Sequence, residues 1–332
     1  MAATQDKLKV ASFFSGGGLL DAGFTKLFDI IFANELNPQA ALCYKHNIGN
    51  HIVVGDLTEL DMDQIPWADL YIGGPPCTDF SSDGANEGVE GETGKLVWDY
   101  FRLIRYKKPT AFLMENVAGL AGFHKSTLRR LVRDYQKAGY LVTVGRMQAQ
   151  DFGVPQSRDR IFIAGFLKEY GKRFIFPLPT QLRKTVRDAI EDLPLPDTGK
   201  TVAGTFPNHV ASWTSPTPER LYDVIANPRN QRRGMRRLEW DKASPTITAH
   251  IAKDGREFLH PYFDRRLTVR ECLRLQGLDD SFVIPSEVKM SQAYRLVGNG
   301  VAKPVADALA YALNSQIKKL VVQLDLFDLI AQ

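Results

Sequence analysis

The stretch KVASFFSGGGLLDAGF (residues 9–24) carries the pattern that decides the fold. Its first six residues (9–14) favour a β-strand, three glycines (16–18) follow, and helix-like spacing covers 19–27. Glycine has no Cβ atom, so the backbone at such a turn can reverse sharply and approach a ligand. The glycine spacing is not GxGxxG, which weakens a pyrophosphate-binding interpretation. The stretch therefore predicts a strand, a ligand-binding turn and a helix.

The alternation of strand and helix continues to residue 166. We expect strands at 9–14, 29–33, 51–54, 69–73, 111–115, 141–148 and 160–166. Further helical patterns lie at 38–47, 95–107 and 126–138. Strands that alternate with helices of about ten residues predict an α/β fold, with a mostly parallel sheet and helices on both faces. Ligands bind such sheets at the carboxyl ends of the strands.

The chain changes character after about residue 177. The region 177–264 is rich in proline and arginine, has little periodicity and includes QRRGMRR (231–237). Helical patterns return at 268–276, 290–297 and 302–319. We expect an α/β domain (1–178), a smaller irregular domain (179–264) and a C-terminal segment (265–332) that packs back onto the first domain.

Composition and charge narrow the class of protein. The 332 residues are 44% hydrophobic and 24% charged, which excludes a disordered or fibrous chain. Residues 1–100 have a charge balance of −10, whereas the rest of the chain has +14. This asymmetry favours one part that binds a small ligand and another that contacts a polyanion. Uneven solvated surface charge is the alternative interpretation.

Several features are absent from the sequence. No apolar run reaches the roughly 18 residues of a membrane span. The start, MAATQDKLK, has no signal-peptide core. Three cysteines without a CxxC pair predict neither a disulfide framework nor a zinc site. We therefore expect a cytoplasmic protein that does not bind a membrane.

Two acidic residues follow the glycine turn, at the ends of the next two predicted strands. Glu35 lies nineteen residues after Gly16, and Asp56 ends VVGD (53–56). A carboxylate after the second strand is suited to accept both hydroxyl protons of a ribose, and Asp56 can accept from amino groups. For each acid alone, a helix cap or a surface position is the alternative interpretation. Together they favour an adenosine-containing cofactor without phosphates.

The motif GGPPCTDFS (73–81) suggests a nucleophile. Two prolines stiffen the backbone and present Cys77 at the carboxyl edge of the sheet. Cys43 and Cys272 are interpreted as buried, small hydrophobic residues. The neighbours of Cys77 are polar and flexible, which favours a nucleophilic thiol at this position.

An acid and two arginines are expected to face the same crevice. Glu115 ends the next predicted strand in MENV (114–117), where helix capping is its alternative role. QSRDR (156–160) places Arg158 and Arg160 on the same side of an entering strand. Such a pair can hold a carboxylate or a phosphate, and an ordinary edge-strand pair is the alternative.

Five motifs of this chain, in their order, resemble those of the DNA (cytosine-5) methyltransferases, in particular bacterial enzymes of restriction-modification type. They are GGPPCTDFS, MENV, QSRDR, RRLTVRECLRLQG (265–277) and VGNGVAKPVA (297–306). The resemblance covers 9–166 and 265–320, and 180–264 falls where the family has its variable target-recognition domain. It implies a Rossmann-like methyltransferase sheet with a smaller, irregular target-recognition domain.

The resemblance also implies S-adenosylmethionine as the cofactor. Glu35 would take the ribose hydroxyls, and Asp56 would lie near the adenine. The full set of residues implied for the cofactor comes from both ends of the chain: Phe14, Gly16, Gly18, Glu35, Asp56, Leu57, Pro76, Asn299 and Val301.

The chemistry implied by the resemblance is methylation of cytosine at carbon 5. The Cys77 thiolate would add to carbon 6 of a base flipped out of the duplex, which makes carbon 5 nucleophilic. Glu115 would hydrogen-bond ring nitrogen 3 and the exocyclic amine. Arg160, with Arg158 as a second candidate, would hold the carbonyl oxygen of the base and orient Glu115. No metal is expected.

Double-stranded DNA is the implied partner. Arginines of the irregular domain would contact phosphates and guanines. The expected DNA contacts are Ser81, Arg229, Arg232, Arg233, Arg236, Arg237, Thr246 and Thr248. We expect a monomer on DNA, with a cognate restriction endonuclease as a second partner of the system.

The sequence departs from the family pattern in places, and two alternatives stay open. Thr78 stands where the family usually has glutamine, and Leu19 where glycine is common. A tRNA cytosine-5 methyltransferase shares the fold and the Cys and Glu motifs, but the arginine-rich segment opposes it. A non-catalytic nucleic-acid-binding protein would tolerate loss of Cys77 or Glu115, and both are present. A nicotinamide dehydrogenase is disfavoured by the glycine spacing.

Overall fold

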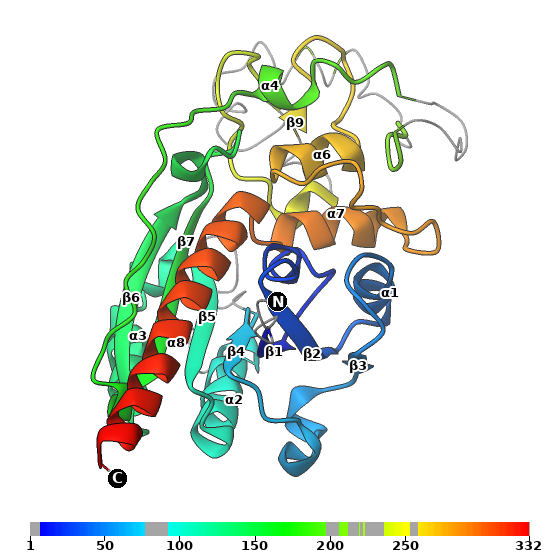
Figure 1. Cartoon of the computed structure of the whole chain (residues 1–332). Coiled ribbons are helices and arrows are strands. Elements are labelled where there is room, and N and C mark those ends of the chain that lie inside the picture. The colour runs from blue at the N-terminus through cyan, green and yellow to red at the C-terminus, as the bar shows by residue number, and fades with distance from the viewer. Residues whose placement is uncertain are drawn as a thin grey trace, which may run out of the picture.

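The computed structural model describes residues 7–76, 92–196, 206–211, 236–252 and 258–331, together with Glu219 and Tyr222. A seven-stranded sheet in the order β3-β2-β1-β4-β5-β7-β6 forms the centre (Figure 1). Its strands are β1 (Leu8–Phe13), β2 (Phe28–Glu35), β3 (Ile52–Val54), β4 (Leu70–Gly73), β5 (Ala111–Val117), β6 (Tyr140–Gln148) and β7 (Asp159–Leu167). All seven predicted strands are confirmed, with ends that agree within two residues.

The sheet is mostly parallel, as its sequence pattern predicts. Strands β1 to β5 pair in parallel, whereas β7 lies antiparallel between β5 and β6. The strand order reverses at β1, which pairs with β2 on one side and with β4 on the other. Ligands of open α/β sheets bind beyond the carboxyl ends of the strands at such a reversal.

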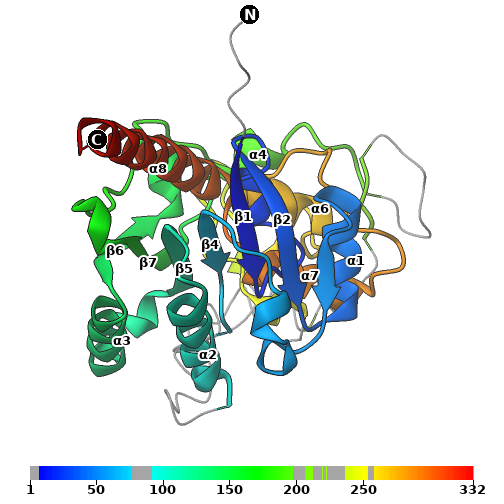
Figure 2. The same cartoon turned by 60° about the horizontal axis from the view of Figure 1, so that its bottom comes forward.

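Helices cover both faces of the sheet (Figure 2). They are α1 (Pro38–Asn47), α2 (Glu92–Lys107), α3 (Lys125–Lys137), α4 (Val186–Ile190), α6 (Val269–Leu275), α7 (Met290–Asn299) and α8 (Lys303–Ala331). Val97 of α2 and Leu131 of α3 pack on one face, and Leu309 and Leu313 of α8 pack on the other. No helix within the described residues is both long and apolar enough to cross a membrane.

The prediction of a helix over residues 19–27 is wrong. Only a short 3-10 turn, η1 (Asp21–Gly23), forms there. Gly18 has a φ of +87°, and a Cβ atom on Gly23 would lie 2.5 Å from the Cβ atom of Ala306 in α8. The turn is thus shaped by a left-handed glycine and by close packing against α8, neither of which a periodic pattern predicts.

A second core lies beyond the carboxyl edge of the sheet. Two short parallel strands, β8 (Arg236–Arg237) and β9 (Phe258–Leu259), belong to it, and Phe258 packs in one cluster with Leu273 of α6 and Leu296 of α7. Helices α6 and α7 therefore share a core with the irregular region, whereas α8 packs on the sheet. The domain boundaries at 178 and 264 stay a prediction.

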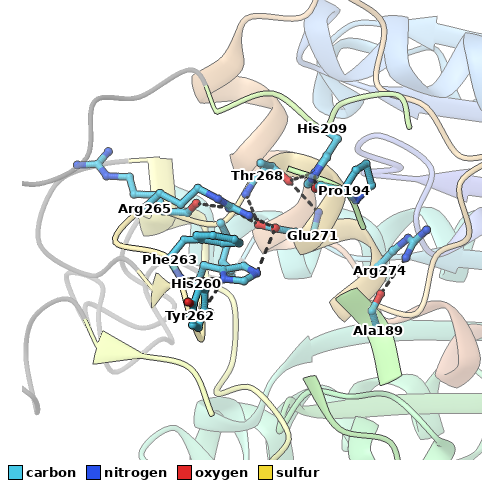
Figure 3. A network of polar contacts seen from close by, with 12 residues as sticks. Ala189, Pro194, His209, His260, Tyr262, Phe263, Arg265, Thr268, Glu271 and Arg274 are labelled. Atoms are coloured by element: carbon cyan, nitrogen blue, oxygen red, sulfur yellow. Dashed lines mark hydrogen bonds and ion pairs between the residues drawn. The ribbon is translucent and has the colours of Figure 1, made fainter. Parts of the chain in front are cut away.

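A buried carboxylate organises this second core (Figure 3). Glu271 of α6 accepts two hydrogen bonds from Arg265, at 2.9 and 2.7 Å, and one from the backbone nitrogen of Thr268 at 2.8 Å. The Thr268 hydroxyl caps the same helix and lies 2.9 Å from Nδ1 of His209. Both oxygens of Glu271 are thereby paired, so its charge is compensated inside the core.

Candidate active site

A cavity of about 1060 Å³ lies at the carboxyl ends of β1, β2, β4 and β5, where α7 passes across the edge of the sheet. The sequence-predicted residues that line it are Phe14, Gly16, Glu35, Asp56, Leu57, Pro76, Glu115, Arg160, Thr246, Thr248, Asn299 and Val301. The fold thus brings together residues from nearly the whole length of the chain.

The glycine turn forms one wall of the cavity. Phe14 and Gly16 both have positive φ angles, of 53° and 56°. Such a conformation is unfavourable for phenylalanine, and strain of this kind concentrates at functional sites. Gly18 does not line the cavity, because a Cβ atom there would meet Ile48 at 2.7 Å on the side of α1. Its role is to permit close packing, which differs from the cofactor contact expected from the sequence.

Glu35 and Asp56 hold the backbone around the same wall. Oxygen Oε2 of Glu35 accepts from the backbone nitrogen of Gly16 at 2.8 Å, and Oε1 accepts from that of Asn37 at 2.8 Å. Burial raises the pKa of Glu35, and these hydrogen bonds oppose the shift. Asp56 accepts from both the backbone nitrogen and the hydroxyl of Thr58 at 2.8 Å. Carboxylate oxygens have further lone pairs, so both acids can still accept from a ligand.

These residues fit an adenosine-containing cofactor. Phe14, Leu57 and Val301 supply apolar walls, and Glu35 and Asp56 supply acceptors for hydroxyl and amino groups. A Cβ atom on Gly16 would have no neighbour within 4 Å, so the cavity is open at the turn itself.

The other end of the cavity holds an ion pair. Oxygen Oε1 of Glu115 lies 2.9 Å from Nε of Arg160, and both side chains are largely buried. Burial raises the pKa of Glu115, and the positive charges of Arg160 and Arg158 oppose this shift. A carboxyl group with a raised pKa more readily donates a hydrogen bond as the neutral acid.

The backbone that leads to Cys77 passes directly beside Glu115. A Cβ atom on Gly74 would lie 3.4 Å from Oε2 of Glu115. The neighbouring Asn116 donates a hydrogen bond to the Pro75 carbonyl at 3.4 Å. Pro76 lines the cavity and is the last residue described on this side. Cys77 itself and the predicted contact Ser81 lie outside the described residues.

The structure separates the two arginines that the sequence pairs. Arg158 is 1% exposed and donates to the carbonyls of Ile247 at 2.7 Å, Gly298 at 2.8 Å and Gly300 at 2.6 Å. Both of its terminal nitrogens are engaged by backbone, and it does not line the cavity. Arg158 therefore does not reach the base beside Arg160, as the sequence suggested. It connects three segments that lie far apart in the chain.

The predicted DNA contacts are only partly described. Arg229, Arg232 and Arg233 lie outside the described residues. Arg236 stacks over Phe258 at 5.3 Å, and Arg237 donates to the carbonyls of His260 at 2.9 Å and Phe263 at 3.1 Å. Arg237 thus contacts backbone carbonyls of its own domain, whereas the sequence suggested that it contacts DNA. Neither of these two arginines lines the cavity.

Two threonines connect the irregular region to the cavity. The Thr246 hydroxyl donates to the Ser157 carbonyl at 2.6 Å. The backbone at Thr248 approaches α7 so closely that a Cβ atom on Gly298 would lie 2.3 Å from the Thr248 carbonyl carbon. Both threonines therefore occupy the rim of the cavity at the junction of the two cores.

Sequence reasoning missed Asp21 and the pair formed by Arg146 and Asp159, all of which line the cavity. Asp21 is fully buried. Its setting in the apolar run GLLDAGF (18–24) is a signal that could have singled it out, since a charged residue among apolar ones needs a reason.

Comparison with known proteins identifies the family. The sequence model of the C-5 cytosine-specific DNA methylases matches residues 8–315. The Type II methyltransferase M.MthTI of Methanothermobacter thermautotrophicus is 34% identical, over 94% of this chain and 98% of the relative. M.NlaX of Neisseria lactamica, also a Type II methyltransferase, is 35% identical over 93% of this chain and 97% of the relative.

Solved structures share the fold. The Entamoeba histolytica methyltransferase EhMeth has a TM-score of 0.70 and 17% identity, covering 94% of this chain and 99% of its own. The S. pombe Dnmt2 methyltransferase has a TM-score of 0.68 and 19% identity, covering 95% of this chain and 99% of its own. With a family match over most of its length, this chain belongs to the C-5 cytosine-specific DNA methylases and is a DNA (cytosine-5) methyltransferase that uses S-adenosylmethionine.

Proposed function

We propose that this enzyme methylates a flipped cytosine within a specific double-stranded DNA sequence, through a covalent bond between Cys77 and the base. The observation that carries the proposal is the position of the Glu115–Arg160 ion pair. It lies beside the backbone of Gly74 and Pro75, in the same cavity as the residues that suit the cofactor.

The cofactor end of the cavity is assigned to the glycine turn and the two acids. Glu35 accepts from the ribose hydroxyls, Asp56 lies near the adenine, and Phe14, Leu57 and Val301 provide apolar contact. Gly16, Pro76 and Asn299 complete this wall. When bound, S-adenosylmethionine supplies an electrophilic methyl group on a sulfonium.

Cys77 provides the nucleophile for the base. Its thiolate sulfur forms a bond to carbon 6 of cytosine, and the electron pair of the carbon 5–carbon 6 double bond becomes available at carbon 5. After methylation, water removes the proton from carbon 5, the double bond re-forms, and the sulfur leaves as thiolate. The two other cysteines are unsuited to this role, because burial raises the pKa of Cys43 to about 12 and that of Cys272 well above its ordinary value.

Glu115 and Arg160 stabilise the base while it reacts. The raised pKa of Glu115 favours the neutral carboxyl, which donates a hydrogen bond to ring nitrogen 3 as negative charge develops on the ring. Arg160 orients this carboxyl through its contact of 2.9 Å and holds the carbonyl oxygen of the base. Arg158 supports the site by fixing the backbone around it.

Access to the cytosine requires base flipping. Both faces of a stacked base are shielded, and extrusion costs a few kcal/mol, which contacts to the DNA backbone offset. Ser81, Arg229, Arg232, Arg233 and Arg236 are assigned to DNA contact from their sequence positions, and Thr246 and Thr248 from their place on the cavity rim.

The domain roles follow from this assignment. Residues 1–178 bind the cofactor and carry the chemistry, 179–264 recognise the target, and 265–332 return to complete the cavity. We further propose that the enzyme acts as a monomer on DNA. Because the relatives compared above are Type II methyltransferases, we propose a cognate restriction endonuclease as the second component of its system.

The covalent step is tested with Cys77→Ala and with DNA that carries 5-fluorocytosine at the target. We expect the variant to bind S-adenosylmethionine and DNA but to transfer no methyl group. With S-adenosylmethionine present, the unmodified enzyme should form a denaturant-resistant complex with the fluorinated DNA, because carbon 5 carries fluorine in place of the proton whose removal would release the sulfur. A matched control is Cys272→Ala, which removes a buried thiol of α6 and should keep both methyl transfer and the denaturant-resistant complex.

Two outcomes would contradict the proposal. One is methyl transfer by Cys77→Ala near the rate of the unmodified enzyme. The other is a fluorinated complex that always dissociates on denaturation. Bisulfite sequencing of DNA from cells that express the chain gives the target sequence, and the same assay with RNA substrates tests the nucleic acid that is used.

A further inference from the structure

Asp21 is a buried carboxylate that the chemistry above does not use. It lies in the turn η1, is 0% exposed and lines the cofactor cavity. Its Oδ2 atom accepts no hydrogen bond within the described part of the chain. An ionised carboxylate in this position is poorly compensated, and burial raises the pKa of Asp21 to about 6.

The groups that face Asp21 come from three elements. β1 presents the Ser12 hydroxyl and α1 presents the Tyr44 hydroxyl, and both oppose the upward shift of its pKa. Helix α8 packs on the turn, and its first-turn charges Lys303 and Asp307 pair with each other at 2.8 Å. No ion pair to Asp21 occurs among the described residues, so no cation of the described chain directly neutralises it.

A chain of hydrogen bonds links Asp21 to the outside of the protein. Tyr44 donates to Oδ1 of Asp21 at 2.9 Å, and the same hydroxyl lies 3.1 Å from Nε2 of His51. His51 lines a separate hollow of about 650 Å³, together with Lys7 and Lys9. A proton can therefore pass between Asp21 and this hollow without crossing the cofactor cavity.

We propose that Asp21 is a charge sensor for the cofactor: it is ionised when the cationic S-adenosylmethionine is bound and protonated when the neutral thioether product S-adenosylhomocysteine takes its place. The proton leaves and returns through Tyr44 and His51. Asp21 is thus a positioning residue, and it acts through its field without contacting the reacting atoms. The inference rests on the cofactor alone and does not require Cys77.

The charge difference between the two ligands gives this residue its effect. Methyl transfer removes the positive charge of the sulfonium, so the product loses an attraction to Asp21 that the substrate has. A buried carboxylate attracts a cation more strongly than a carboxylate in water does, and we expect this attraction to favour the charged ligand by about tenfold. Asp21 therefore strengthens binding of the methyl donor relative to the product and favours product release.

The test is calorimetric binding of each ligand to the full chain without DNA, between pH 5 and pH 8. For the unmodified protein we expect the preference for S-adenosylmethionine over S-adenosylhomocysteine to rise about tenfold across this range, with a midpoint near pH 6. Titrations at pH 6 in two buffers of different ionisation enthalpy should show proton release with the donor and none with the product. Asp21→Asn should have a flat preference and release no proton. A pH-dependent preference that survives in Asp21→Asn overturns the proposal.

Two further variants keep the test decisive. Tyr44→Phe retains the carboxylate but removes a hydroxyl that lowers its pKa, so the midpoint should move to higher pH. This shift of the midpoint tests the role of Asp21 even if Asp21→Asn does not fold. His51→Gln removes the titratable ring at the far end of the hydrogen-bond chain and should leave the midpoint unchanged. Loss of the pH dependence in His51→Gln, or an unmoved midpoint in Tyr44→Phe, would contradict the role of Asp21.

Discussion

Two fully buried carboxylates, Glu271 and Asp21, have opposite surroundings. Glu271 lies in the second core, where Arg265 contacts both of its oxygens and the backbone nitrogen of Thr268 contacts one (Figure 3). Asp21 lies beside the cofactor cavity, where the hydroxyls of Tyr44 and Ser12 face it and its Oδ2 atom has no hydrogen-bond partner among the described residues. The first acid is fully compensated by the protein, whereas the second leaves room for a charge from outside.

The difference separates a structural charge from a functional one. A paired carboxylate such as Glu271 specifies how α6, the segment at 265 and the irregular region fit together. Breaking such a pair is expensive, because it leaves an uncompensated charge in the core. An incompletely paired acid such as Asp21 costs stability in the free protein, and function is the usual reason for keeping it.

The largest expected effect comes from Arg265→Met, which leaves Glu271 without its cation. We expect the free energy of unfolding to fall by about 4 kcal/mol, as for other buried pairs that lose one partner. Urea denaturation at pH 7 measures this effect. The control is Arg187→Met, whose partners Asp241 and Glu191 are both exposed, so that its loss should change stability little. Equal losses in the two variants would contradict the comparison.

A smaller effect on the free energy of unfolding is expected when the pH is lowered and His260 becomes protonated. Its Nδ1 accepts the backbone nitrogens of Tyr262 and Phe263 at 3.2 Å, which requires the neutral ring, and burial lowers its pKa to about 4. The folded pKa lies below the unfolded value, so this contribution is complete above pH 6.5 and is lost as pH falls toward 4. We expect a loss of about 2 kcal/mol over this window.

This loss is measured as the difference between the unmodified protein and His260→Gln in urea unfolding at pH 7 and pH 5. The difference between the two proteins should shrink as the pH is lowered. A difference that stays constant with pH would mean that His260 is not held in its neutral form.

The smallest effect, and one of opposite sign, is expected for Asp21→Asn. The folded pKa of Asp21 is raised to about 6, so its stabilising contribution is present at low pH and lost as pH rises through 6. The variant has no charge to bury and should be about 1 kcal/mol more stable than the unmodified protein at pH 8, after the cost of an imperfectly paired amide. Thermal unfolding at pH 8 and pH 4.5 checks this, since the advantage should vanish at the lower pH.

The sheet was predictable because its information is local. Each strand is a short β-rich run between turn signals, and all seven were found within two residues of their bounds. MENV and QSRDR indicated Glu115 and Arg160, the strand ends indicated Glu35 and Asp56, and all four residues do line one cavity. Motif order and spacing therefore carried most of the site.

What could not be predicted depends on contacts between distant segments. Arg158 binds three backbone carbonyls, which have no side-chain signature in any sequence. The helix predicted around Asp21 does not form because Gly23 packs against Ala306 of α8, almost three hundred residues further along the chain. The position of Asp21 likewise depends on Tyr44 of α1. No local pattern around any of these residues contains its partner.

The contacts of Arg158 have a consequence for how the protein is made. Its guanidinium joins the start of β7 to the carbonyls of Gly298 and Gly300. During translation the strands of the sheet leave the ribosome long before these two glycines, and domains fold in the order of synthesis. A nascent chain can therefore assemble its sheet before its pocket is complete, so the enzyme can bind the methyl donor only after Gly298 and Gly300 have been synthesised and have reached Arg158.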